Sequence, residues 1–165
     1  MKASLFSDEE YNIWLVLGHI HHALTKARER ELHPNDITPE QADTLFCIQV
    51  LNDKATLNML SRCMIREHHT IAALTSRMEN KGLLNKVVPA KNRKTSTKIK
   101  LTKKGKDAYK LAADRKSIHR AMSALSAEEK IQLRRILEKL RDAALKELAV
   151  VFKPVGPPPL DIEPE

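Results

Sequence analysis

The stretch that decides the fold is residues 56–106, which read TLNMLSRCMIREHHTIAALTSRMENKGLLNKVVPAKNRKTSTKIKLTKKGK. Its first part predicts a short helix that Thr56 can cap. The apolar residues Leu57, Leu60 and Met64 recur at spacings of three and four, as one buried helical face requires. A short turn is expected near residues 65–66. This first helix has the size and place of a positioning helix.

A second helical pattern follows the turn. Ile71, Leu74, Thr75 and Met78 form its buried face, and Lys81-Gly82 supplies a basic last turn and a residue that tolerates left-handed backbone. In a recognition helix, residues near the start reach base edges in the major groove. The residues expected to contact DNA on the opposite face are His68, His69, Thr70, Ala73 and Arg77.

Two β-compatible runs, residues 84–88 and 97–101, flank a polar loop over residues 89–96 and predict a two-stranded wing. Nine Lys or Arg residues lie between residues 86 and 106, with no Asp or Glu. A solvated lysine-rich face is the ordinary explanation of such a run. Directly after a helix-turn-helix pattern, contact with phosphate is the better interpretation.

These segments resemble the MarR family of bacterial winged-helix transcription regulators. The resemblance is carried by LNMLSR at residues 57–62, Thr70-Ile71, SRMENKGLL at 76–84 and LTKKG at 101–105, and it covers roughly residues 8–152. It implies that Arg93, and after it Lys94, enters the minor groove, and that Lys98 contacts DNA. Wings of this family often carry an acidic residue before the tip arginine, whereas this chain has Asn92-Arg93-Lys94.

The resemblance and the helical patterns together predict a mainly α fold with a small β wing. About six helices and a two-stranded antiparallel wing are expected, with the N- and C-terminal helices forming a dimer body. The expected regions are 1–37, an N-terminal dimerisation helix and loop; 38–106, the DNA-binding lobe; 107–153, C-terminal dimerisation helices; and 154–165, a proline-rich acidic tail.

Capping motifs place the remaining helices. Ser7 and Glu10 form a capping box for a first helix that runs to about Leu32. The next begins with Thr38-Pro39 and runs to Leu51, with proline at its first position. A helix capped by Thr102 is expected to continue to about residue 122, and a box at 126–129 opens a last helix to about residue 152.

The last helix carries a long apolar stripe at helical spacing. Packing within the monomer would explain it, but two-fold DNA sites favour two-fold proteins, and the family resemblance agrees. The residues expected at a homodimer interface are Ile13, Leu133, Ile136, Leu137, Leu140 and Leu148.

The composition suits one domain with a polyanionic partner. The chain has 165 residues and a net charge of +8; residues 154–165 hold three acids and no base, so residues 1–153 carry 29 basic and 18 acidic side chains. Aromatic residues make up only 4%, too few for a base-stacking single-strand binder. No signal peptide or membrane-length apolar run is present, which predicts a cytoplasmic protein without membrane contact.

Cys47 and Cys63 fall in different expected helices, without CxxC spacing. We expect both to be reduced and buried, as small apolar side chains of a cytosolic protein. Redox sensing is the alternative, and it would require an exposed thiolate of low pKa. In the family that the chain resembles, thiol sensors usually place their cysteine in the first helix, where this chain has none.

The histidines raise the question of a metal site. His19, His21, His22, His33 and His119 offer no convergent set that a Cys or carboxylate completes, so neither metal nor cofactor is expected. The resemblance instead implies a pocket for a small aromatic or anionic effector where the first, second and fifth helices meet. The residues assigned to it are Trp14, His19, His22 and Phe46, for which ordinary core packing is the alternative.

The expected function is sequence-specific binding of double-stranded DNA by a homodimeric regulator, most simply a repressor, that an effector modulates. No glycine-rich phosphate loop, nucleophile motif or paired carboxylates indicate an enzyme. One alternative is an architectural protein that coats DNA regardless of sequence. Another is a winged helix that binds proteins and not DNA.

Overall fold

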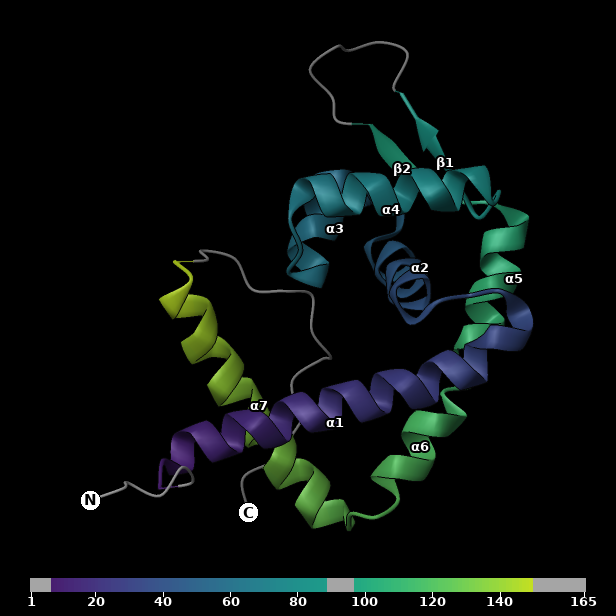
Figure 1. Ribbon diagram of the computed structural model, residues 1–165. Coiled ribbons are helices and arrows are strands. Elements are labelled where there is room, and N and C mark those ends of the chain that lie inside the picture. The colour runs from purple at the N-terminus through teal and green to yellow at the C-terminus, as the bar shows by residue number, and fades with distance from the viewer. Residues whose placement is uncertain (1–6, 89–96, 150–165) are drawn as a thin grey trace, which may run out of the picture.

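The computed structural model describes residues 7–88 and 97–149, and Figure 1 shows the arrangement of their elements. In these ranges the chain forms seven α-helices and one two-stranded antiparallel sheet, with two short 3₁₀ helices at His33–Asn35 and Asn52–Lys54. The helices and strands are α1 Glu9–Leu32, α2 Pro39–Leu51, α3 Leu57–Met64, α4 His68–Asn80, β1 Leu84–Val87, β2 Lys98–Leu101, α5 Lys103–Ala112, α6 Lys116–Met122 and α7 Ala127–Glu147.

Residues 38–106, the lobe expected to bind DNA, contain most of the core of the structure. α2 lies at its centre, with α3, α4 and the sheet on one side and α5 beside it (Figure 1). The largest side chains with almost no exposure in this lobe are Leu45, Leu60, Ile71, Met78, Leu84 and Ile99. They come from α2, α3, α4 and both strands, so one cluster joins every element of the predicted helix-turn-helix and wing.

Local capping agrees with the sequence at most helix starts. Thr38 and Gln41 form a capping box at α2 with Pro39 at the first position, and Thr56 accepts a hydrogen bond from the Met59 amide at α3. The first helix differs from the prediction. Its N-cap is Asp8, not Ser7, because Asp8 holds the extended backbone and its carboxylate accepts from the Tyr11 amide at 3.0 Å.

The wing is hydrogen-bonded in the register Leu84 opposite Leu101 and Val87 opposite Lys98. Gly82 has φ +72° and lets the chain turn from α4 into β1. Gly105 permits a close approach, because a Cβ at this position would lie 1.9 Å from the Leu83 carbonyl oxygen. These contacts explain two glycines in the motifs that carry the family resemblance.

The helix expected from Lys103 to about residue 122 is instead two helices. α5 ends at Ala112, Arg115 adopts left-handed backbone with φ 49°, and α6 begins at Lys116. Side chains of α1 supply hydrogen bonds on both sides of this break, to the Ala112 carbonyl before it and to the Lys116 and Ser117 amides after it. The prediction of one continuous helix was therefore wrong.

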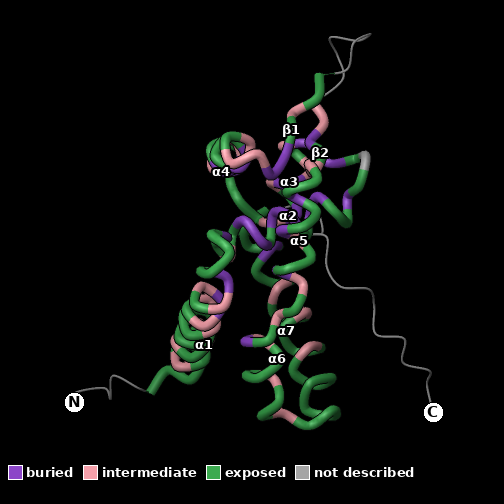
Figure 2. The backbone as a smooth tube through the Cα atoms, turned by 90° about the vertical axis from the view of Figure 1, so that its right-hand side faces the viewer, coloured by how far each residue is buried: buried purple, intermediate pink, exposed green. Residues whose placement is uncertain are grey.

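α1 and α7 bury little of their own surface. Figure 2 shows burial concentrated around α2, α3 and the strands, while most of α1, α6 and α7 is exposed. α7 has one buried residue, Leu145. All six residues assigned to the dimer interface have exposed side chains, from 36% for Leu133 to 66% for Leu148. Packing within this chain therefore does not cover the apolar stripe.

Cys47 and Cys63 are both buried, as expected, but they are not reduced. A disulfide joins them across a Cα–Cα distance of 6.5 Å, which is within the ordinary range for a disulfide. The sequence could not reveal this pairing, because it depends on how α2 packs on α3.

Candidate nucleic-acid interface

α4 presents a polar and small-residue face to solvent. Its buried side, Ile71, Leu74, Thr75 and Met78, faces the core. His68, His69, Ala73 and Arg77 are exposed, and Thr70 is half-buried. The structure thus places all five predicted α4 contact residues outside the lobe core.

Two side chains of α4 fix the wing to this helix. The Lys86 ammonium of β1 donates to the Ser76 hydroxyl at 2.8 Å and lies 3.4 Å from a Glu79 carboxylate oxygen. The Lys86 backbone amide also donates to Glu79 at 3.0 Å. Lys86 is one of the nine basic residues between 86 and 106, but its charge is engaged within the lobe. The wing and the recognition helix are therefore held as one unit.

The base of the wing is tied to the start of α3. The Ile99 amide donates to the Ala55 carbonyl at 2.9 Å, and Lys98 forms an isolated bridge with Thr56. Lys98 is half-buried, whereas Lys100, Lys103, Lys104 and Lys106 are exposed. Arg93 and Lys94, the predicted minor-groove residues, lie outside the described residues.

A cavity of about 280 Å³ lies where α1, α2 and α5 meet. Its lining includes Phe46, one of the four residues assigned to the effector pocket, together with Arg28, Ala42, Asp43, Tyr109, Ala112, Ala113 and Arg115. Trp14, His19 and His22 are exposed on α1 and do not line this cavity. Within one chain the structure therefore does not bring the four residues together.

The cavity has an aromatic wall and two guanidinium groups. The Arg115 guanidinium lies 5.5 Å from the centre of the Phe46 ring, within cation–π range. Asp43 faces the same space, and desolvation raises the pKa of its carboxyl group although the positive charges of Arg28 and Arg115 oppose the rise. An aromatic anion would match this combination of rings and cations.

Arg28 and Glu31 of α1 hold the break between α5 and α6. The buried Arg28 guanidinium donates to the Ala112 carbonyl at the end of α5 and lies 3.0 Å from Glu31. The Glu31 carboxylate accepts from the Lys116 amide at 2.8 Å, the Ser117 amide at 3.0 Å and the Ser117 hydroxyl. A carboxylate at a helix start satisfies amides that have no partner within the helix.

This environment shifts the acid–base behaviour of Glu31. Desolvation acts to raise the pKa of its carboxyl group, but the hydrogen bonds from Ser117, Arg28 and Lys116 together outweigh that effect and lower the pKa to about 2. Arg28, Glu31 and Ser117 are not among the residues predicted from the sequence. No local signal marks their role, because the bonds from Arg28 to Ala112 and from Glu31 to the start of α6 join residues more than 80 positions apart.

In residues 7–88 and 97–149, no group of three or more His, Cys, Asp or Glu side chains is arranged to hold a metal ion. Across the same ranges, every helix is too short or too polar to span a bilayer.

Comparison with solved structures identifies the fold. The organohalide-sensing transcriptional regulator RdhR, in its 2,4-dichlorophenol-bound form, aligns with a TM-score of 0.82 and 26% identity over 95% of this chain and 98% of that chain. MepR from S. aureus in complex with DNA aligns with a TM-score of 0.73 and 25% identity over 83% of this chain and 99% of that chain. No protein-family model matches the chain, and no curated protein matches it.

A cysteine-to-serine variant of MarR from E. coli, complexed with operator DNA, aligns with a TM-score of 0.75 and 18% identity over 84% of this chain and 99% of that chain; at this identity the likeness concerns fold alone. The chain is a winged helix-turn-helix protein. Its structural neighbours are MarR-family transcriptional regulators, which confirms the resemblance inferred from its motifs.

Proposed function

We propose that the chain is a homodimeric, sequence-specific regulator of transcription that binds double-stranded DNA and acts as a repressor. The observation that carries the proposal is the exposed face of α4, held rigidly to a basic wing by Glu79 and Ser76. Structural neighbours include regulators bound to DNA. Their function also argues against catalysis by this chain, and DNA as the partner implies the cytoplasm.

In this proposal, Thr70 and Ala73 contact bases through a hydroxyl and a methyl group, and Arg77 holds a phosphate. His68 and His69 contact bases or phosphates at the start of α4. Lys98 contacts the sugar–phosphate backbone of the DNA beside the wing, and Arg93 and Lys94 reach the minor groove. Two copies related by a two-fold axis place their α4 helices in successive major grooves.

Homodimerisation through α1 and α7 completes the proposal. Support comes from the exposed apolar stripe of α7 and from Ile13 on α1, which this chain leaves uncovered. Regions 1–37 and 107–153 then form the dimer body, and region 38–106 forms the DNA-binding lobe. Residues 154–165, the proline-rich tail, have no assigned role.

A small aromatic or anionic effector is proposed to bind the cavity beside Phe46. Arg115 would hold its negative charge, because Arg28 is already paired with Glu31, and Phe46 and Tyr109 would pack on its ring. One neighbour was solved with 2,4-dichlorophenol bound. Trp14, His19 and His22 could join this site only from a partner subunit. The cavity borders both the dimer body and the lobe, so a bound molecule can change the spacing of the two α4 helices.

The test is a fluorescence-anisotropy titration against the DNA upstream of the protein's own gene and against a scrambled duplex of equal length, at several salt concentrations. A sequence-specific regulator should prefer its operator by about a thousandfold or more. Equal, steeply salt-dependent binding to both duplexes would favour the architectural alternative or an operator elsewhere. No salt-sensitive binding at all would favour a winged helix that binds proteins.

A further inference from the structure

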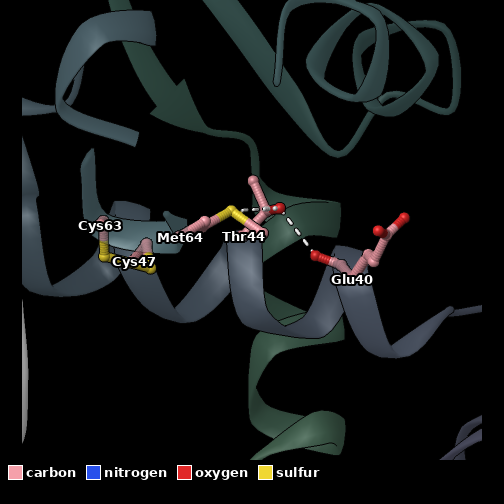
Figure 3. Close-up of a disulfide and its surroundings, with 5 residues drawn as sticks. All are labelled: Glu40, Thr44, Cys47, Cys63 and Met64. Carbon is pink, nitrogen blue, oxygen red and sulfur yellow. Dashed lines mark hydrogen bonds between the residues drawn. A yellow bond between two sulfur atoms is a disulfide. The ribbon is translucent and has the colours of Figure 1, made fainter. Parts of the chain in front are cut away.

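The disulfide joins the two helices that support the recognition helix. Cys47 lies on α2, and Cys63 lies in the last turn of α3 (Figure 3). One turn earlier on α2, the Thr44 hydroxyl donates to the Glu40 carbonyl at 2.7 Å and approaches the Met64 sulfur at 3.4 Å. Besides core packing, the described contacts between α2 and the end of α3 include this covalent bond, this weak polar contact and an exposed ion pair between Glu40 and Arg66 at 3.7 Å.

Cys63 is two residues before the turn that leads into α4. Ile65 takes left-handed backbone with φ 51°. The Ser61 hydroxyl donates to the Arg66 carbonyl at 2.5 Å, and the Arg66 amide donates to the Ser61 carbonyl at 3.0 Å. The end of α3 and the start of α4 are thus one hydrogen-bonded unit, so a bond that holds Cys63 to α2 also holds the start of the recognition helix.

The lobe has enough apolar contact to stay folded without this bond. Leu45, Leu60 and Ile71 are almost fully buried in the same core cluster as the two cysteines, and a free cysteine packs well as a small apolar side chain. Reduction would therefore release α3 from α2 without removing the core. Disulfides in the cytosol of most organisms are transient, and they serve catalysis or redox sensing more often than stability.

We propose that Cys47 and Cys63 form a reversible thiol–disulfide pair that sets operator affinity: the disulfide form is the high-affinity state, and reduction weakens DNA binding by freeing α3 and the start of α4. This inference rests on the proposed function. It differs from thiol sensing through the first helix, because both sulfurs belong to the DNA-binding lobe of a single chain.

The chemistry is thiol–disulfide exchange with a dithiol. Both sulfurs are buried in the folded lobe, with Cys47 5% and Cys63 8% exposed, so the exchange proceeds when the end of α3 opens locally. One thiolate of the dithiol then attacks a sulfur of the pair, the Cys47–Cys63 bond breaks, and a mixed disulfide forms. The second thiolate of the dithiol then attacks that mixed disulfide. The dithiol leaves oxidised as a cyclic disulfide, and both cysteines take up protons. A low-molecular-weight disulfide reverses the reaction and leaves as two thiols.

The primary test compares operator affinity of the full chain in the two redox forms. Protein is incubated with dithiothreitol or with oxidised glutathione, and mass spectrometry after alkylation counts free thiols. We expect about tenfold weaker operator binding in the reduced form, with restoration on reoxidation. Equal affinity of both verified forms would overturn the proposal and leave the disulfide a structural cross-link.

Two variants separate the disulfide from its surroundings. Cys47→Ala/Cys63→Ala should bind operator as weakly as the reduced protein and should ignore dithiothreitol. Thr44→Val removes the neighbouring contact to Met64 but keeps both cysteines, so it should retain the redox response. A Cys47→Ala/Cys63→Ala variant with full affinity, or one that still responds to dithiothreitol, would overturn the proposal.

Circular dichroism and amide hydrogen exchange distinguish a local loosening of α3 from unfolding of the whole lobe. We expect both redox forms to have the same helical content, with faster exchange in residues 57–70 after reduction. Loss of the lobe's helices on reduction would overturn the switch in favour of a purely structural bond. If neither form prefers operator yet exchange still rises in residues 57–70, the proposed function fails while the coupling of the disulfide to α4 stands.

Discussion

The DNA-binding lobe and the dimer body use apolar residues in opposite ways. In the lobe, α2, α3, α4 and the strands direct them inward, and Leu45, Leu60, Ile71 and Ile99 are almost completely covered. In the body, α1 buries only Arg28 and Leu32, and α7 buries only Leu145 (Figure 2). The lobe is complete within one chain, whereas the body presents surface that a second copy would cover.

The two regions also differ in how they are joined internally. Short-range caps and one shared cluster hold the lobe. By contrast, the contact of α1 with the α5–α6 break depends on a few polar groups, chiefly Arg28 and Glu31. Changes in the body should therefore alter assembly and DNA affinity, and changes in the lobe core should alter the stability of the fold.

The largest expected effect comes from disrupting the proposed dimer interface on α7. In Ile136→Glu/Leu140→Glu, two exposed apolar residues of α7 become charged, which should give a folded monomer. Because one lobe then binds one half-site alone, operator affinity should fall by about 10²- to 10⁴-fold. Sedimentation velocity and anisotropy measure the two effects. The control Val50→Glu changes a comparably exposed residue of the lobe and should leave the dimer intact; a dimeric double variant would contradict the assignment.

Gly105→Ala should lower the stability of the lobe. The added Cβ would meet the Leu83 carbonyl oxygen at 1.9 Å, so α5 or the turn after α4 must shift, at a cost of about 3 kcal/mol in the free energy of unfolding. Urea denaturation measures the loss. The matched control is Gly18→Ala on α1, where no atom lies within 4 Å and the change should be neutral or stabilise by up to about 1 kcal/mol. Equal stability of the two variants would contradict this account.

Glu31→Gln should weaken the contact between α1 and the break between α5 and α6. The folded-state pKa of Glu31, about 2, is below its ordinary value of 4.5, so the carboxylate stabilises the fold above pH 4.5 and loses this effect as the pH falls toward 2. We expect the variant to be less stable by about 2 kcal/mol at pH 7 and to approach the parent near pH 2 to 3. Urea denaturation across this pH range tests it.

The control for Glu31 lies on the same helix. Glu29 pairs with Lys26 at 2.8 Å on the surface, so Glu29→Gln should change stability by no more than about 0.5 kcal/mol. A difference between Glu31→Gln and the parent that stays constant from pH 7 to pH 3 would show that the carboxylate charge is not what stabilises the joint.

The smallest expected effect concerns the two histidines at the start of α4. His68 and His69 are exposed at the start of α4, where an imidazole N–H can donate to a base edge or a phosphate. The variant His68→Ala/His69→Ala should therefore bind operator a few-fold more weakly, and the control His119→Ala on α6 should bind as the parent does. Fluorescence anisotropy measures both affinities. Unchanged affinity of the double variant would exclude these histidines from the contact surface.

Much of the lobe follows from the sequence because its determinants are local. Thr38, Thr56, Thr102 and Ser126 cap helices where the sequence places them, and the apolar periodicity gives the buried faces of α3 and α4 correctly. The strands agree with the two predicted runs to within one residue. At the first helix the prediction of Ser7 as the cap was wrong, because Asp8 holds the extended backbone of the N-cap residue.

The candidate interface was predictable for the same reason. Helical periodicity separates His68, His69, Ala73 and Arg77 from the core, so α4 alone assigns them to the outer face. The role of Lys86 was not predictable. Its charge is engaged by Ser76 and Glu79 only once β1 lies against α4. The cavity likewise depends on three helices far apart in the sequence, which is why only Phe46 of its four assigned residues lines it.

By itself, the sequence determined most of the helix starts, the wing, the basic surface and the apolar stripe of α7, because each depends on residues close together in the chain. The tertiary structure alone decided the α5–α6 break, the Cys47–Cys63 bond and the cavity. The break needs carboxylate and guanidinium groups from a helix more than 80 residues away to satisfy exposed helix ends. The bond needs α2 packed on α3 before two distant sulfurs can meet.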